Sequence, residues 1–351
     1  MKKLSMVVAM LLVAIMLLTA CAPVQAPTAQ DQAAEEPKKT VPESTEPKAE
    51  EPSNDQIVVG FCNIAETAEL HSVVKKSMEE AAAAKGYELI YMNNKLDGQV
   101  AVSNADAMLL RGIDAFIEFN VDVSIAPVIM EKMNDAGVPV VAVDIAHPGA
   151  IYFGANNYGV GPIVGEYLGN ICKKEWGEPD CLLIVEDAMS GVTVLARTDN
   201  VIDGFKKVFP DFADDKVYKI DGGADTTDSQ EVVANFLSAH PDFNKIAVAP
   251  AHVTMTLGAL AAIETAGRQT DCLLVSQGEY DYLEYLRNNP EEPEWEVFRG
   301  TLVYNFKNYG TYCMDIVEKL LAGETVAEEC FPDHFIIDRT NAAKFYPEAF
   351  N

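Results

Sequence analysis

The sequence predicts an α/β protein made of two lobes, each a doubly wound parallel sheet. From Ile57 onward, short apolar runs rich in β-branched residues alternate with amphipathic segments of helical period. Alternation of this kind, with short connections, is typical of parallel strands covered by helices on both faces. About ten such strands are more than one compact sheet usually carries, which favours two lobes.

The first lobe begins with the strand 57–61 (IVVGF). The helix 70–86 follows, with Leu70, Val74 and Met78 on one face and Gly86 as its stop signal. The next elements alternate in the same way: strand 87–92, helix 99–111, strand 115–120, helix 124–137, strand 138–144 and strand 151–156.

The second lobe continues this alternation with equally short connections. Its expected elements are helix 159–174, strand 181–186, helix 193–208, strand 216–220, helix 228–239, strand 245–249, helix 253–266, strand 272–276, helix 280–288, strand 300–306 and helix 309–322. Ligands of doubly wound sheets bind beyond the carboxyl ends of the strands. Asp144, which ends the apolar run VPVVAVD, therefore stands where a ligand is expected.

The N-terminal segment predicts export and lipid anchoring. Two lysines and an apolar stretch precede LTAC, which resembles the lipobox of bacterial lipoproteins. We expect residues 1–20 to be a signal peptide and Cys21 to be lipidated; an ordinary secretory signal is the alternative. Residues 21–56 carry prolines and charges without an aromatic side chain, which predicts a disordered tether.

Charge and motifs exclude several classes of function. The net charge of −28 disfavours binding to nucleic acid or anionic lipid. The sequence contains no GxSxG, HExxH or GxxxxGK[ST] motif. GVGPIVG (159–165) nearly matches a dinucleotide fingerprint, but its third glycine is one place late, so close helix packing explains it better. Cys172 and Cys181 allow a disulfide, although buried free thiols are the preferred interpretation.

Segments in order along the body carry a resemblance to a known family. KGYELIYMNN, LLRGIDAFIEFNVD, MNDAGVPVVAVD, GANNYGVGPIVGEYLG, LSAHPDFNKIAVAP and TLGALAAIETAG follow one another as in periplasmic binding proteins of the ribose/galactose type. The resemblance implies the type I fold, whose two lobes are joined by three chain crossings. It places 57–155 and 305–328 in the N-terminal lobe, and 156–304 and 329–351 in the C-terminal lobe.

The resemblance also implies the ligand contacts. Asn120 and Asp144 match family positions that bind sugar hydroxyls, and Arg197 falls near the family's sugar-clasping arginine. Elsewhere the family's contact residues are replaced, beginning with Ile145, which stands where the family commonly has arginine. The substitutes that we expect to line the site are His71, His252, Gln277, Glu279 and Tyr304.

These observations predict a monomeric, lipid-anchored solute-binding protein of an ABC importer, held outside the cell membrane and delivering a small polar ligand to permease subunits. The ligand is a sugar, polyol or nucleoside-like compound, and its identity is open. No catalysis and no cofactor are expected. A sensory receptor that feeds a transmembrane kinase is the alternative, and an extracellular enzyme is a remote one. A zinc site formed by His71, His147 and His252 is conceivable, but no ligand spacing supports it.

Overall fold

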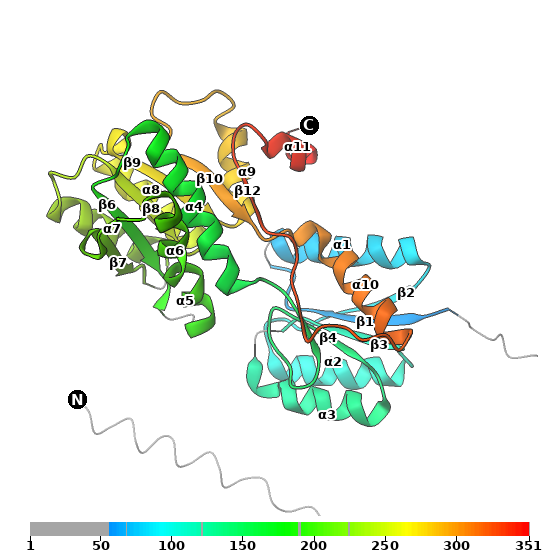
Figure 1. Ribbon diagram of the computed structural model, residues 1–351. Helices are drawn as coiled ribbons and strands as arrows, with labels where there is room; N and C mark the ends of the chain where they lie inside the picture. Colours follow the sequence, from blue (N-terminus) through cyan, green and yellow to red (C-terminus); the bar gives the residue numbers. More distant parts are fainter. Residues whose placement is uncertain (1–55, 68, 121, 189–190, 224, 351) are drawn as a thin grey trace, which may run out of the picture. The chain divides into compact units, whose positions relative to one another are not determined.

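The computed structural model describes residues 56–350, apart from residues 68, 121, 189–190 and 224 (Figure 1). The predicted signal peptide, Cys21 and nearly all of the predicted tether lie outside these residues. Within the part described, no helix combines the length and the apolarity that crossing a membrane requires.

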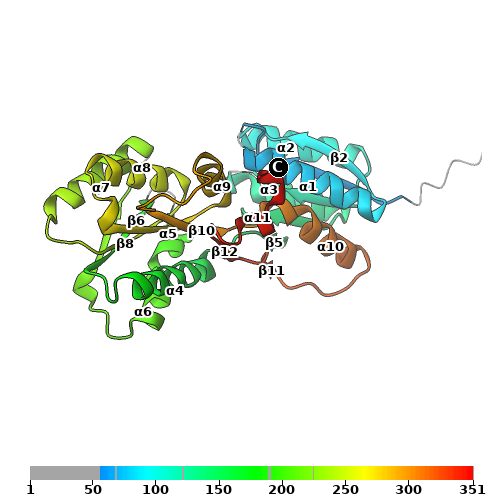
Figure 2. The same ribbon diagram turned by 90° about the horizontal axis from the view of Figure 1, so that it is seen from above.

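The first sheet has six parallel strands in the order β11-β5-β4-β3-β1-β2. Apolar side chains alternate between its faces, so that Phe61 and Ile117 lie in one core while Cys62 and Phe116 lie in the other. Helices α1 and α10 cover the first of these faces, and α2 and α3 cover the second (Figures 1 and 2). The elements are β1 (Val58–Asn63), α1 (Glu69–Lys85), β2 (Glu88–Asn93), α2 (Gly98–Leu110), β3 (Ala115–Glu118), α3 (Ala126–Ala136), β4 (Val140–Val143), β5 (Ile151–Phe153), α10 (Tyr309–Leu321) and β11 (Glu329–Cys330).

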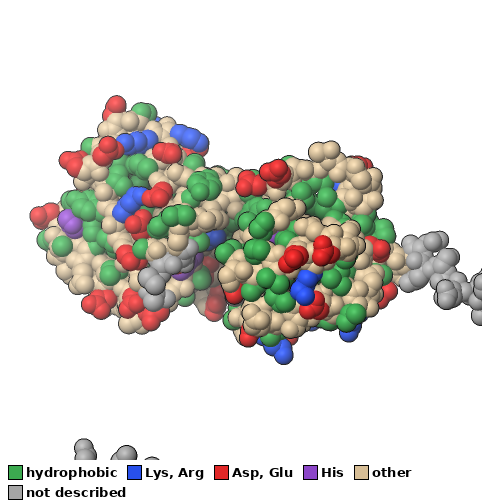
Figure 3. All heavy atoms as spheres, turned by 90° about the horizontal axis from the view of Figure 1, so that it is seen from below, with side chains coloured by type: hydrophobic (Ala, Val, Ile, Leu, Met, Phe, Trp, Pro, Cys, Tyr) green, Lys and Arg blue, Asp and Glu red, His purple; other side chains and the backbone are tan. Residues whose placement is uncertain are grey.

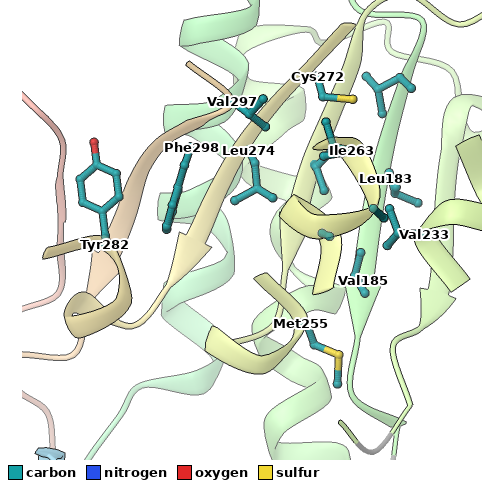
Figure 4. Close-up of a cluster of buried hydrophobic side chains, with 14 of the residues drawn as sticks. Leu183, Val185, Val233, Met255, Ile263, Cys272, Leu274, Tyr282, Val297 and Phe298 are labelled. Atoms are coloured by element: carbon teal, nitrogen blue, oxygen red, sulfur yellow. The ribbon is translucent and has the colours of Figure 1, made fainter. Parts of the chain in front are cut away.

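The second sheet also has six strands, in the order β12-β10-β9-β8-β6-β7. All of its pairings are parallel except that of the edge strand β12 with β10. Its core on the side of α7, α8 and α9 is shown in Figure 4, where Leu274 and Phe298 of the strands face Tyr282 and Ile263 of the helices. The elements are α4 (Asn157–Glu175), β6 (Cys181–Glu186), α5 (Gly191–Asp199), α6 (Val201–Val208), β7 (Val217–Asp221), α7 (Thr226–Ala239), β8 (Ile246–Pro250), α8 (Val253–Thr265), β9 (Cys272–Gln277), α9 (Glu279–Asn288), β10 (Phe298–Val303), β12 (Phe335–Ile337) and α11 (Ala342–Phe345).

Helices α4 and α6 pack so closely that their backbones meet. A Cβ atom added at Gly165 would lie 1.9 Å from the carbonyl oxygen of Val201, and one at Gly204 would lie 1.9 Å from that of Pro162. Gly165, the last glycine of GVGPIVG, is therefore required for helix packing, which supports the preferred interpretation of this motif. The predicted single helix over 193–208 is wrong, because it divides at Asn200 into α5 and α6.

The chain passes between the sheets three times. We name these segments the first crossover (154–156, from β5 to α4), the second crossover (304–308, from β10 to α10) and the third crossover (331–334, from β11 to β12). Glu329 and Cys330, which fall in the predicted C-terminal lobe, pair with β5 of the first sheet. A two-residue edge strand has no apolar pattern from which its sheet could be read. The division into lobes stays a prediction, while the type I fold with two six-stranded sheets is confirmed.

Candidate functional site at the strand ends

Most of the predicted contact residues lie at the carboxyl ends of parallel strands. Asn120 follows β3 and Asp144 follows β4 in the first sheet, whereas Gln277 ends β9 and Tyr304 follows β10 in the second. His252 lies between β8 and α8. The topology therefore brings polar side chains to the edges where ligands of such sheets bind.

Asp144 is held in place at the first crossover. Its Oδ1 accepts hydrogen bonds from the Ala155 backbone N–H at 3.0 Å and from the Tyr309 hydroxyl at 3.3 Å. Its backbone adopts the left-handed region, with φ of 58°. Gly154 permits this approach, because a Cβ atom there would lie 2.3 Å from Oδ1.

The charge state of Asp144 reflects two opposing effects. Burial of the carboxyl raises its pKa, because a low-dielectric surrounding disfavours the charged form. The N–H of Ala155, the positive charge of Arg197 and the hydroxyl of Tyr309 oppose this shift. Further hydrogen-bond donors would therefore favour the ionised form of Asp144.

Arg197 of α5 joins this group from the second sheet. Its Nε donates to the Oδ1 of Asn157, and its guanidinium lies 4.8 Å from the centre of the Tyr304 ring. The same positive charge lowers the pKa of Asp144. The structure therefore brings Asp144, Arg197 and Tyr304 close together, while a shared ligand site stays a prediction.

Gln277 and Tyr304 form a buried pair beside Arg197. The Tyr304 hydroxyl donates to the Oε1 of Gln277 at 3.2 Å, and the Nε2 of Gln277 donates to the backbone oxygen of Arg197 at 3.4 Å. Burial raises the pKa of Tyr304 to about 12, so the phenol is protonated and acts as a donor. The pair fixes the position of the Tyr304 ring under the guanidinium.

Asn120 is buried, and its amide is largely occupied within the protein. Its Nδ2 donates to the Oε1 of Glu118 at 3.2 Å and lies 3.2 Å from the Nε2 of His147, while its Oδ1 accepts from the Asp122 N–H at 2.9 Å. The Nδ1 of His147 lies 2.8 Å from the Ile145 carbonyl oxygen. Because a carbonyl only accepts, Nδ1 carries the proton and Nε2 accepts from Asn120. Both Nδ2 hydrogens of Asn120 are thereby used.

Glu118 lies at the centre of this network, and the sequence reasoning overlooked it. Its Oε1 accepts from Asn94 at 3.0 Å as well as from Asn120, and the weak donor Cys62 lies beside the carboxyl. Its Oε2 has no hydrogen-bond partner among the described residues. Burial raises the pKa of Glu118 to about 8, so the carboxyl is mostly protonated at neutral pH. A glutamate inside the buried run AFIEFN is the signal that could have found it.

The remaining predicted residues have different surroundings. The His252 Nε2 lies 3.0 Å from the Oδ2 of Asp187. His71 is 8% exposed at the start of α1, where burial lowers its pKa and its backbone oxygen accepts from Asn63. Among the described residues no group of three His, Cys, Asp or Glu side chains is arranged to hold a metal ion.

Glu279 is fully buried and braces the second crossover. Its Oε2 accepts the Tyr304 N–H at 3.0 Å, and its Oε1 accepts the Phe306 N–H at 3.3 Å. The Tyr346 hydroxyl lies 3.5 Å from Oε1. Through these hydrogen bonds Glu279 orders the second crossover. Contact of Glu279 with a ligand stays a prediction.

Acidic side chains are more widespread than basic ones on the face shown in Figure 3, in keeping with the net charge of −28. One cavity of about 560 Å³ is lined by residues of α1, α9 and the second crossover, and by Tyr346, Glu348 and Ala349. It contains none of the predicted contact residues. The candidate site therefore rests on the strand ends and not on this cavity.

Comparison with known proteins identifies the class of protein to which this fold belongs. The model of the family described as periplasmic binding protein domain matches residues 59–325, so the chain belongs to this family, whose members bind solutes without catalysing a reaction. The predicted resemblance is confirmed at this level.

Individual relatives are more distant. The chain is 27% identical to the ribose import binding protein of Bacillus subtilis over 201 residues, which span 56% of this chain and 61% of that protein. A solute-binding protein of Actinobacillus succinogenes, solved with bound D-allose, superposes with a TM-score of 0.65 at 17% identity, covering 82% of this chain and all of that one. One from Bacillus halodurans with bound myo-inositol gives 0.64 at 18% identity, covering 85% and 100%.

Proposed function

We propose that this chain is the solute-binding component of an ABC importer and that it captures a sugar or polyol between its two lobes. Family membership and the names of the relatives support this class of ligand: ribose for one, and D-allose and myo-inositol for two solved structures. The lobes are those predicted from the sequence, with Glu329 and Cys330 assigned to the first because they pair with β5.

The observation that carries the proposal is the placement of Asp144 beside Arg197 and Tyr304. Among the described residues, the Ala155 N–H and the Tyr309 hydroxyl both donate to Oδ1 of Asp144. A carboxylate offers about four lone-pair sites, so Oδ2 can accept the hydroxyls of a sugar or polyol. Arg197 is held through Nε, and its Nη atoms donate to the same ligand.

Asn120 has a smaller part in this proposal than the family pattern implies. Since Glu118 and His147 take its Nδ2 hydrogens, only its Oδ1 can receive a ligand hydroxyl. We assign it the role of positioning residue at the end of β3. From the second sheet, His252 and Gln277 complete the set of contacts.

Capture works by hinge closure in this proposal. A ligand that contacts both sheets favours the state in which the strand ends lie close together, by its differential affinity for that state. The closed form then docks on permease subunits. Lipidation of Cys21 keeps the protein at the outer side of the cell membrane. Metabolic labelling with an alkyne fatty acid tests the anchor: the label should be present on the wild type and absent from Cys21→Ser.

A thermal-shift screen of the purified full chain tests the ligand class. D-Ribose, D-allose, myo-inositol and a panel of nucleosides are added at millimolar concentration, and a true ligand raises the midpoint by mass action. Asp144→Asn should lose the shift, whereas Asp106→Asn, a surface change on α2, should keep it. A nucleoside shift without a sugar or polyol shift would refute the ligand class, and an unchanged shift in Asp144→Asn would refute the site.

A further inference from the structure

The three crossovers meet at one side chain, His334. This residue lies at the end of the third crossover, immediately before β12. Its Nε2 accepts the backbone N–H of Asn156 in the first crossover at 3.1 Å. Its Nδ1 lies 3.2 Å from the backbone oxygen of Val303, where β10 enters the second crossover. The imidazole ring of the third crossover therefore contacts the backbone of the first crossover and that of Val303, the residue directly before the second crossover.

These partners fix the tautomer of His334. The Val303 carbonyl can only accept, so Nδ1 carries the proton, and Nε2 must be unprotonated to accept the Asn156 N–H. The Tyr304 ring packs edge-on against the imidazole, with 5.8 Å between the centres. The neutral Nδ1–H tautomer is the form that satisfies both bonds.

We propose that His334 is the positioning residue of the hinge: in its neutral form it ties the three crossovers together, and its protonation releases the first crossover from the other two. An imidazolium would place an N–H at Nε2, opposite the N–H of Asn156. Two donors facing each other cannot bond, so the link between the first and third crossovers is lost.

The charged and polar surroundings oppose this protonation at neutral pH. Burial lowers the pKa of His334, and the positive charge of Arg197 on α5 lowers it further. The Val303 carbonyl and the charge of Asp333 in the third crossover act in the opposite direction. Because the folded-state pKa is depressed, the contribution of His334 to stability is complete above about pH 6.5, the pKa of an unfolded histidine. It is lost as the pH falls from that value through the folded-state pKa.

Two acidic side chains hold the first and second crossovers in place. Asp144 holds the first crossover through Ala155, and Glu279 holds the second through Tyr304 and Phe306. His334 joins the two. The consequence for capture, a lower ligand affinity in acid, rests on the proposed function, but the hinge link itself does not.

NMR of the ligand-free full chain tests the link directly. At about pH 7.5 the imidazole ¹⁵N shifts should report an unprotonated Nε2, with a coupling across the hydrogen bond to the Asn156 amide nitrogen. On titration to about pH 5 the chemical shift of the Asn156 amide should change with the same midpoint as the His334 imidazole shifts. This midpoint should lie below about 6.5, the pKa of a free histidine. An Nε2–H on His334 at neutral pH, or an Asn156 amide that ignores the His334 titration, would overturn the proposal.

Variants separate the hinge role from a merely structural one. His334→Gln retains an acceptor near the Nε2 position but cannot be protonated. The chemical shift of the Asn156 amide should therefore no longer change as the pH falls, and the chain should stay folded. His334→Asn keeps a donor near Val303 but removes that acceptor, and it should perturb the Asn156 amide at every pH. In the control variant His240→Gln, a change at the end of α7, the Asn156 amide should respond to pH as it does in the wild type. If the Asn156 amide shift still changes in acid in His334→Gln, a group other than His334 causes the change, and the proposal is wrong. Because no ligand enters this experiment, its failure is distinguishable from failure of the sugar screen.

Discussion

Replacement of Glu118 by glutamine should flatten the pH dependence of stability. Glu118 is fully buried, and its pKa rises from 4.5 to about 8 on folding. Its protonated form is therefore favoured by the fold, and this contribution is complete below the unfolded value and lost as the pH rises through the folded value. Glutamine presents the same Oε1 to Asn94 and Asn120 without a proton to bind.

The magnitude follows from linkage. At pH 7 the unfolded carboxyl is ionised while the folded one is mostly protonated. Between pH 4.5 and pH 7 the wild type thus loses at most about 3 kcal/mol of unfolding free energy, at 1.36 kcal/mol per pKa unit. Glu118→Gln removes this loss, so its stability relative to the wild type should rise by a similar amount across the same range.

Urea denaturation at several pH values between 4.5 and 8 measures the effect. The difference between variant and wild type cancels the titration of every other group. Glu131→Gln on the exposed face of α3 is the matched control and should parallel the wild type. If Glu118→Gln also parallels the wild type, the buried carboxyl is not protonated as we infer.

Two further changes test packing and the second crossover. Gly165→Ala should destabilise the second lobe by about 3 kcal/mol in urea, because the new Cβ meets the Val201 backbone. Gly169→Ala, whose Cβ would meet side chains alone, those of Val208 at 3.1 Å and Phe205 at 3.5 Å, should cost clearly less. Equal losses would contradict the tight α4–α6 contact. Glu279→Gln should cost about 1–3 kcal/mol, because its amide group faces one of the two N–H donors at the second crossover. Glu284→Gln, a change at an exposed position of α9, is the control. An unchanged free energy of unfolding in Glu279→Gln would contradict the stabilising role of its hydrogen bonds to the second crossover.

The alternation of strands and helices was readable from the sequence because each element buries a continuous apolar pattern. The run VPVVAVD contains β4 with Asp144 directly after it, and the helical face of Leu70, Val74 and Met78 contributes Val74 and Met78 to a core. The edge strands β11 and β12 could not be assigned in the same way. They are two and three residues long, and their pairing depends on chain segments far away in the sequence.

The candidate site was predictable in residue type but not in hydrogen bonding. The sequence places Asp144, Arg197 and Tyr304 at strand or helix ends, and the structure brings them together. It cannot show that the amide hydrogens of Asn120 are taken by Glu118 and His147, since those partners depend on how β3 and the 144–150 loop meet. The role of Glu279 was hidden for the same reason, because its partners are backbone groups of the second crossover.

Isothermal titration calorimetry with D-ribose, D-allose and myo-inositol measures whether Asp144 binds a sugar or polyol. We expect at least one of these compounds to bind the wild type and Asp106→Asn with equal affinity. Asp144→Asn should bind that compound at least about tenfold more weakly, as expected when a charge-assisted hydrogen bond is lost. Equal affinity in Asp144→Asn, or heat from none of the three sugars and polyols, would contradict it.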